Sequence, residues 1–335
     1  MNNDLKEPLL AARKSKVKFD QEGFRTPRIL GYLYFFLYIT MISVFNMLAK
    51  VLYVRTPTLT PNQLIFARSI ITIFVYLAIL NVNTKKHLFS AIPLVMRWHV
   101  FCRSALSATA ILLIYVLIRA FPLIYMSLVM STEPLFTAIF SYLLLDKTLS
   151  RLDIIVLIAS FSGVFVLITG GPVGDCTKDS LTGWALVIPI IALLLAAPLT
   201  SLASIYQRYV KEVSPYAVGS YIAVIFTVAT GVIIPIFEGG FGFYALFGLL
   251  DYLILLILGS VTTVVLLLLA KSSQHEEPAK VTFINYLQPV LMLMSDIAVF
   301  KTDFSTQQII GIVIVLSAIA VRAGVGIRRV FFKVK

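Results

Sequence analysis

The stretch STEPLFTAIFSYLLLDKTLS, residues 131–150, places a carboxylate, Glu133, and a helix breaker, Pro134, inside a long apolar run. The residues before and after this stretch are also mostly apolar. A charged side chain at the centre of a bilayer costs about 2.5–3.5 kcal/mol on insertion scales, so such residues face a water-filled cavity or a partner. The stretch therefore indicates a membrane-spanning helix with a polar interior on one side.

The composition of the whole chain agrees with a membrane protein. Of its 335 residues, 59% are hydrophobic and 13% are charged. A soluble domain is about half apolar and about a quarter charged. A water-soluble fold of this size could not bury so much apolar surface, so lipid must be the solvent for much of the chain.

The apolar runs have the length of helical spans. A helix that crosses a bilayer needs about 20 mostly apolar residues. The runs are too long for membrane strands and lack their alternation. We therefore predict an all-α membrane protein with ten transmembrane helices. The predicted spans are residues 29–49, 62–80, 98–118, 121–145, 152–170, 181–207, 216–237, 250–270, 278–300 and 306–321.

The net charge of +12 is distributed unevenly between the two faces. With a cytoplasmic N-terminus, 21 Lys and Arg residues fall on the cytoplasmic side and four on the other side. This positive-inside asymmetry predicts that both termini are cytoplasmic, with basic tails at 1–28 and 327–335. The basic balance is thus a topology signal, and nucleic acid is not an expected partner.

The chain repeats itself once. Aligning the stretch from Glu133 with that from Gln288 places Glu133-Pro134 on Gln288-Pro289, an offset of 155 residues. Pro61 corresponds to Pro215 at an offset of 154. The predicted repeats, 29–170 and 181–326, hold five spans each. Because five is odd, equivalent helices cross the membrane in opposite directions, as in many secondary transporters with a substrate site near mid-membrane.

An ordered series of stretches resembles the EamA-like branch of the drug/metabolite transporter superfamily, which includes the eukaryotic solute carrier 35 proteins. The resemblance covers about residues 30–325. The stretches that carry it are FNMLAK (45–50), TPNQLIFAR (60–68), RSALSATAILLIYVLI (103–118), STEPLFTAIFSYLLLDKTLS (131–150), FSGVFVLITG (161–170), SIYQRYVKEVSP (204–215) and INYLQPVLMLMSDIAVF (284–300).

The resemblance implies a ten-helix carrier with cytoplasmic termini. Spans one to four and six to nine would line the cavity, and spans five and ten would lie outside it, where they support homodimers in many members. Arg68 and Arg103 match arginines of the family, and Tyr115 and Tyr206 join the candidate cavity residues on family position alone. Glu133 departs from the family, because many relatives carry a small or apolar residue there.

Glu133 has three expected fates. It could form an ion pair with Arg68 or Arg103, remain a protonated carboxyl, or relay protons. Pro134 and Pro289 should kink spans four and nine beside Glu133 and Gln288, although both prolines could also only shape packing.

The other candidate residues for substrate binding or gating each have a structural alternative. Lys50 and Asn46 share one helix face, and Lys50 could instead extend to the interface, as could Arg103. The remaining polar candidates would either hydrogen-bond to other helices or bind a polar solute. They are Asn285, Tyr286 and Gln288.

These observations favour a secondary carrier of a small polar metabolite, with an organic anion or a phosphorylated or nucleotide-linked solute as the expected substrate. Alternatives are a neutral amino-acid or amphipathic-solute exporter on the same fold, and a channel or non-transporting membrane organiser. The sequence has no phosphate-binding GxxxxGK[ST] loop and no HExxH, so no enzyme, cofactor or metal is expected. The host would be the plasma membrane or an organelle membrane.

Overall fold

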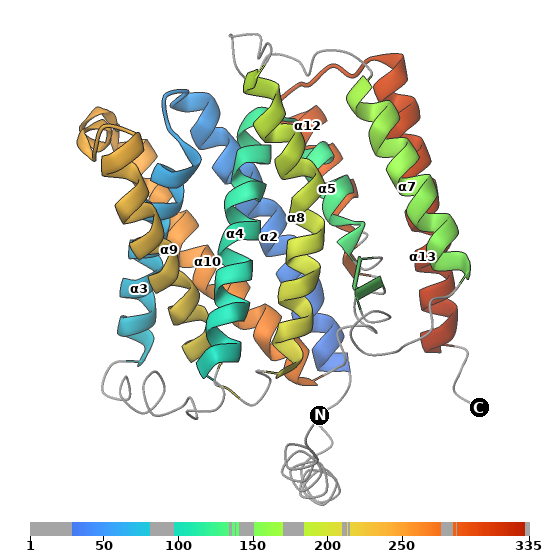
Figure 1. The fold of residues 1–335 in the computed structure, drawn as a ribbon, viewed down its shortest axis with the longest axis horizontal. Helices are drawn as coiled ribbons and strands as arrows, with labels where there is room; N and C mark the ends of the chain where they lie inside the picture. The colour runs from blue at the N-terminus through green and yellow to red at the C-terminus, as the bar shows by residue number, and fades with distance from the viewer. Residues whose placement is uncertain are drawn as a thin grey trace, which may run out of the picture.

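The computed structural model describes residues 29–80, 97–133, 136–137, 139–140, 151–169, 184–209, 213, 215–275, 284–285 and 287–331. These residues form ten α-helices and a 3-10 helix, η5 (Gly242–Leu246), and Figure 1 shows the helices packed side by side. The helices are α2 (Ile29–Arg55), α3 (Pro61–Leu80), α4 (Arg97–Ala120), α5 (Leu123–Met130), α7 (Arg151–Thr169), α8 (Trp184–Tyr209), α9 (Pro215–Phe237), α10 (Leu249–His275), α12 (Leu287–Ala298) and α13 (Thr306–Phe331).

The helices suit a bilayer in length and in surface. In the described part of the chain, α2, α3, α4, α9 and α10 are long and apolar enough to cross a membrane. A helix of 27 residues, such as α2 or α10, measures about 40 Å. Large apolar side chains such as Ile155, Phe165 and Phe237 point outward and are more than 60% exposed. Lipid would cover this apolar surface, as expected for an integral multi-pass membrane protein.

Two helices begin with the same capping motif. Thr60 caps α3: its hydroxyl accepts the Gln63 N–H, and the Gln63 side chain accepts the Thr60 N–H. Ser305 and Gln308 make the same reciprocal bonds at the start of α13. Pro61 occupies the first helical position of α3, where an N–H group would have no intrahelical acceptor, so the lack of one in proline costs nothing. These local signals set the two helix starts.

The helix pairs follow a twofold pattern. α2 packs on α10, and α4 packs on α8. In the repeat, α8 is the counterpart of α2 and α10 is the counterpart of α4, so each of these two pairs is the counterpart of the other. α3 with α9, α5 with α12 and α7 with α13 pair equivalent helices directly. In Figure 1, α2 begins and α13 ends at the lower end of the bundle, whereas α8 begins at the upper end. This is the arrangement expected of an inverted repeat, and the charge asymmetry predicts that the lower end is cytoplasmic.

Span four, predicted as one helix over 121–145, is broken. α5 starts after Pro122 and ends at Met130, and Ser131 and Thr132 form a turn before the chain is helical again at Glu133. The Ser131 and Thr132 hydroxyls donate to the carbonyls of Ser127 and Val129, a competition that bends helices. Pro134 lies outside the described residues, but a proline has no N–H to donate to the Met130 carbonyl.

Span nine also differs from its prediction over 278–300. α12 begins at Leu287, so Pro289 lies in its first turn. The first four N–H groups of a helix have no intrahelical acceptor, so a proline is tolerated there without a kink. Pro289 therefore stands near the start of the described helix α12, and the kink expected there stays a prediction. The final helix α13 continues to Phe331, into the region predicted as a basic tail, while residues 1–28 lie outside the described part.

α7 and α13 approach closely at two glycines. A Cβ atom on Gly163 would lie 2.5 Å from a Val315 methyl carbon, and one on Gly311 would lie 2.8 Å from the Gly163 carbonyl oxygen. In Figure 1 this helix pair stands at the edge of the bundle opposite α3 and α9. Small residues at such crossings let membrane helices pack at short distance.

Replacing Gly311 by leucine should separate α7 from α13. Overpacking a well-packed contact costs about 1–3 kcal/mol, and the atoms in the way here belong to backbone that cannot rotate aside. A lower melting temperature of the detergent-solubilised protein would report the loss. Gly324→Leu on the same helix is the matched control, because a Cβ there meets nothing within 4 Å. Equal melting temperatures for the two variants would contradict the prediction.

Candidate functional site

Arg68 on α3 lies in the interior of the bundle and is 4% exposed. Its Nη1 atom donates a hydrogen bond to the hydroxyl of Thr262 on α10, 3.2 Å away. The guanidinium carbon lies 5.5, 4.9 and 5.2 Å from the ring centroids of Phe45, Tyr115 and Phe226, which come from α2, α4 and α9. Four helices besides its own therefore surround one positive charge.

The Arg68 charge lacks a matching anion. Its Nε and Nη2 atoms are buried and have no hydrogen-bond acceptor, and no described carboxylate forms an ion pair with it. The buried hydroxyls of Tyr115 and Tyr53 are also without a hydrogen-bond partner. Aromatic faces offset only part of a buried cation's lost hydration, about 2 kcal/mol or somewhat more. The site can therefore accept the oxygen atoms of an anion.

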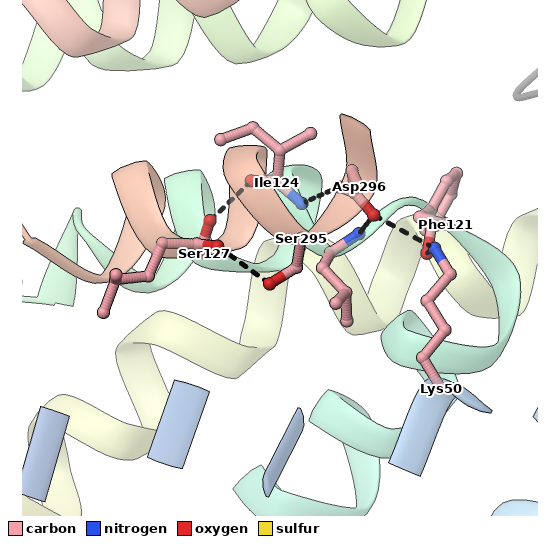
Figure 2. A network of polar contacts seen from close by, with 8 residues as sticks. Lys50, Phe121, Ile124, Ser127, Ser295 and Asp296 are labelled. Carbon is pink, nitrogen blue, oxygen red and sulfur yellow. Dashed lines mark hydrogen bonds and ion pairs between the residues drawn. The ribbon is translucent and has the colours of Figure 1, made fainter. Parts of the chain in front are cut away.

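Nearer the upper end of the bundle, Lys50 on α2 and Asp296 on α12 form a buried ion pair (Figure 2). The Nζ atom lies 3.5 Å from Oδ1 of Asp296, and the side chains are 1% and 0% exposed. Lys50 also donates to the Phe121 carbonyl oxygen at 3.1 Å and lies 5.1 Å from the ring centroid of Phe300. Lys50 therefore does not extend to the membrane interface.

Asp296 also caps α5. Its two carboxylate oxygens accept the N–H groups of Leu123 and Ile124, at 3.0 and 2.7 Å (Figure 2). These are the first residues of α5, where an anion satisfies unpaired donors and complements the helix dipole. Residues 123–129 are all buried. These contacts join the two halves near this end of the bundle. Lys50, Asp296 and the start of α5 are together called the upper network.

Glu133 lies just below the end of α5 and is half-buried. Its Oε1 atom accepts a hydrogen bond from the hydroxyl of Ser204 on α8, at 2.7 Å. Within the described residues no basic group pairs with it, so the expected ion pair with Arg68 or Arg103 is not formed. Arg103 is buried and donates to Ser107 on its own helix.

The remaining predicted residues lie elsewhere in the bundle. Asn46 is buried one turn before Lys50, and Tyr206 on α8 lies with its ring centroid 6.4 Å from that of His99 on α4. Asn285 and Gln288 are half-buried at the start of α12, and Tyr286 lies outside the described residues. Arg68 and Tyr115 are thus brought together, and Lys50 and Glu133 stand apart from them with partners of their own.

The sequence did not predict most of the side chains that contact these charged groups. Phe45, Phe226, Thr262 and Ser204 contact charged groups, but their apolar or hydroxyl side chains are common in every span. The ion pair between Lys50 and Asp296 was not predicted. These contacts join helices far apart in the chain, and no local pattern marks them.

Two five-helix halves around buried, unpaired charge have the architecture of a membrane transport protein. The family profile described as "EamA-like transporter family" matches residues 29–169 and 187–323, so this chain belongs to the EamA-like transporter family. It is accordingly a transmembrane transporter of the drug/metabolite type and not an enzyme.

A solved structure titled "Crystal structure of protein" has the same fold. It superposes with a TM-score of 0.60 at 16% sequence identity, and the match covers 89% of this chain and 98% of the other. At that identity the likeness concerns the fold alone. No curated protein matches the sequence.

Proposed function

We propose that this transporter is a secondary carrier of a small organic anion, with phosphorylated and nucleotide-linked solutes in its substrate class. The observation that carries the proposal is the unpaired Nε and Nη2 atoms of Arg68 in a buried site. These two nitrogens form one edge of the guanidinium plane. That edge binds two oxygens of a carboxylate or phosphate at once, with charge-assisted hydrogen bonds.

The charges around Arg68 support an anion over a neutral solute. Lys50 is already paired with Asp296, so it adds no net charge to the interior. Arg68 has no such partner in the part of the chain that the structure describes. The Tyr115 and Tyr53 hydroxyls are buried and available to donate to further oxygens of the solute. An anion bound here would satisfy all three groups together.

Alternating access requires that one end of the central site is shut while the other is open. The upper network supplies a closed end, because Lys50 and Asp296 connect α2 to α12 and Asp296 holds the start of α5. Opening that end means breaking contacts between the two halves of the repeat. Inverted-repeat carriers move in this way, with one repeat or bundle shifting against the other around a fixed site.

Counterflow in proteoliposomes tests the proposal. Vesicles loaded with one labelled solute are exposed to a panel of a monocarboxylate, a phosphomonoester, a nucleotide sugar and neutral amino acids. We expect saturable exchange with at least one anion and none with the neutral amino acids. Exchange with neutral solutes alone would establish the exporter alternative, single-channel currents a channel, and no flux of any kind a non-transporting organiser.

A further inference from the structure

We propose that Glu133 is the proton-binding site of this carrier, which takes up one proton at its carboxylate during each transport cycle. The proposal rests on the transport function proposed above. Its first support is the missing counter-charge: Glu133 has one hydrogen-bond donor, Ser204, and no described basic group within ion-pair distance. A half-buried carboxylate with one neutral hydrogen-bond donor and no counter-charge is costly as an anion, and protonation reduces that cost.

The position of Glu133 in the fold is the second support. It follows α5 directly after the turn at Ser131 and Thr132, about 15 Å along the chain from the start of α5. The chain is helical again from Glu133 onward, so the carboxylate stands at the break between two helical segments. Backbone groups at such a break lack the partners they would have inside a continuous helix. Broken helices supply coupling-ion sites in other carriers built from inverted repeats.

Three hydroxyl groups lie near Glu133, and one of them, on Ser204, contacts its carboxylate. Ser204 donates to Oε1, Thr137 donates to the Glu133 carbonyl oxygen, and the Thr137 and Ser201 hydroxyl oxygens lie 2.9 Å apart. Hydroxyls can both donate and accept, so they accommodate the carboxylate and the carboxylic acid alike. A metal cation needs several oxygen ligands together, and only the Ser204 oxygen contacts the carboxylate in the described residues, so a proton is the better ligand.

The charged and titratable groups around Glu133 are few. Tyr38 on α2 interacts electrostatically with both Glu133 and Arg103 of α4, while Arg103 donates to Ser107. On α8 the neighbour is Ser204, with Tyr206 half a turn further on.

The helices packed on α5 add little charge near Glu133. α12 carries neutral Gln288 and, at the opposite end of α5, Asp296. α7 and α13 present neutral groups to α5, among them the Leu167 carbonyl and Gln308, both facing Tyr125. The described residues therefore give Glu133 no ion-pair partner, and Arg103 is the basic group in its surroundings.

Binding and release of the proton balance in atoms, and the charge of the proton offsets that of an anion on Arg68. A proton delivered by hydronium forms one O–H bond with a Glu133 oxygen, which turns the carboxylate into a carboxylic acid and leaves water. The same bond breaks when the proton is released on the other side. With a monoanion on Arg68, one proton on Glu133 makes the transported charge zero. Transport of a monoanion together with this proton would be electroneutral.

Infrared difference spectroscopy tests proton binding without any solute. The full-length protein in liposomes is taken through a pH jump, and the carbonyl stretch of protonated carboxyl groups is recorded. We expect one component of this band in the wild type to be absent in Glu133→Gln. Glu238→Gln is the matched control, because Glu238 accepts from Thr60 and Asn62 beyond the end of α9 and its loss should leave the Glu133 component in place.

Identical spectra for the wild type and Glu133→Gln would overturn the proposal. Glutamine keeps the acceptor oxygen that Ser204 uses, so the fold should survive, and thermal melting checks this. If the variant does not fold, Glu133→Asp provides the test: the component must shift with the altered environment, and an unshifted band counts against the site.

Coupled proton movement is then measured with a pH-sensitive dye inside proteoliposomes, using the anion that counterflow identifies. The wild type should acidify the lumen during uptake, and Glu133→Gln should lose that signal completely. Wild-type uptake without acidification would refute the coupling. An absence of exchange with every anion would instead refute the proposed carrier function, and the infrared result would stand independently.

Discussion

Replacing Arg68 by glutamine should reduce anion exchange about 100-fold or more, while the protein still folds. Each hydrogen bond to a charged group contributes about 1.5–3 kcal/mol, and two are lost with the Nε and Nη2 edge. Every 1.4 kcal/mol corresponds to about a factor of ten in affinity. The measurement is the concentration dependence of counterflow in proteoliposomes.

Two further variants separate charge from geometry. Arg68→Lys keeps the positive charge but loses the planar edge, so its exchange should fall between wild type and glutamine. Arg55→Gln is the matched control, since Arg55 pairs with Asp251 at 2.9 Å but is 44% exposed, where an ion pair contributes little. Unchanged exchange in Arg68→Gln would show that the anion binds elsewhere.

Thermal stability of Arg68→Gln provides a separate criterion. The wild-type guanidinium is buried and only partly satisfied, so its removal should leave the melting temperature unchanged or higher. A large fall in melting temperature together with lost exchange would instead assign Arg68 a structural role.

Asp296→Ala should lower the free energy of unfolding by about 3–5 kcal/mol. Removing one partner of a buried ion pair leaves the other charge uncompensated. Here Lys50 would keep only the Phe121 carbonyl and the Phe300 ring, and the N–H groups of Leu123 and Ile124 would lose their acceptor. Chemical denaturation of the purified protein in detergent, followed by tryptophan fluorescence or circular dichroism, measures the loss.

The double variant Lys50→Met with Asp296→Leu is the control for this assignment. Replacing a whole buried pair by apolar residues is often close to neutral, so stability should recover in part relative to Asp296→Ala. The α5 N–H groups stay uncapped, so full recovery is not expected. A double variant less stable than Asp296→Ala would contradict the view that uncompensated charge is the main penalty.

Asp296→Ala should also open the upper end of the bundle. Ser127 on α5 is fully buried, so Ser127→Cys in a background without Cys102 and Cys176 should react slowly with a soluble thiol reagent. Adding Asp296→Ala should speed that reaction severalfold, because α5 is no longer held by the other half. Equal labelling rates would show that the upper network does not control access to this end.

Several features could be predicted from the sequence because their causes are local. Helix-length apolar runs predicted ten helices, and the described residues form ten α-helices, most of whose ends lie within a few residues of the expected bounds. Thr60, Pro61 and Gln63 start α3 through contacts within four residues of one another. The cost of a charge in lipid was sufficient to single out Arg68 and Glu133 before any neighbour was known.

The partners of these charges were decided only by the tertiary structure. Lys50 and Asp296 are 246 residues apart in the chain, and the rings around Arg68 come from three other helices. The break at Ser131 depends on competing hydroxyl hydrogen bonds, where the sequence predicted only a kink at Pro134. An apolar run is sufficient to predict a membrane-spanning helix, because lipid favours apolar side chains at every position along the span. Which polar group meets which depends on how the helices cross, and crossing depends on side-chain shapes from both halves packed together.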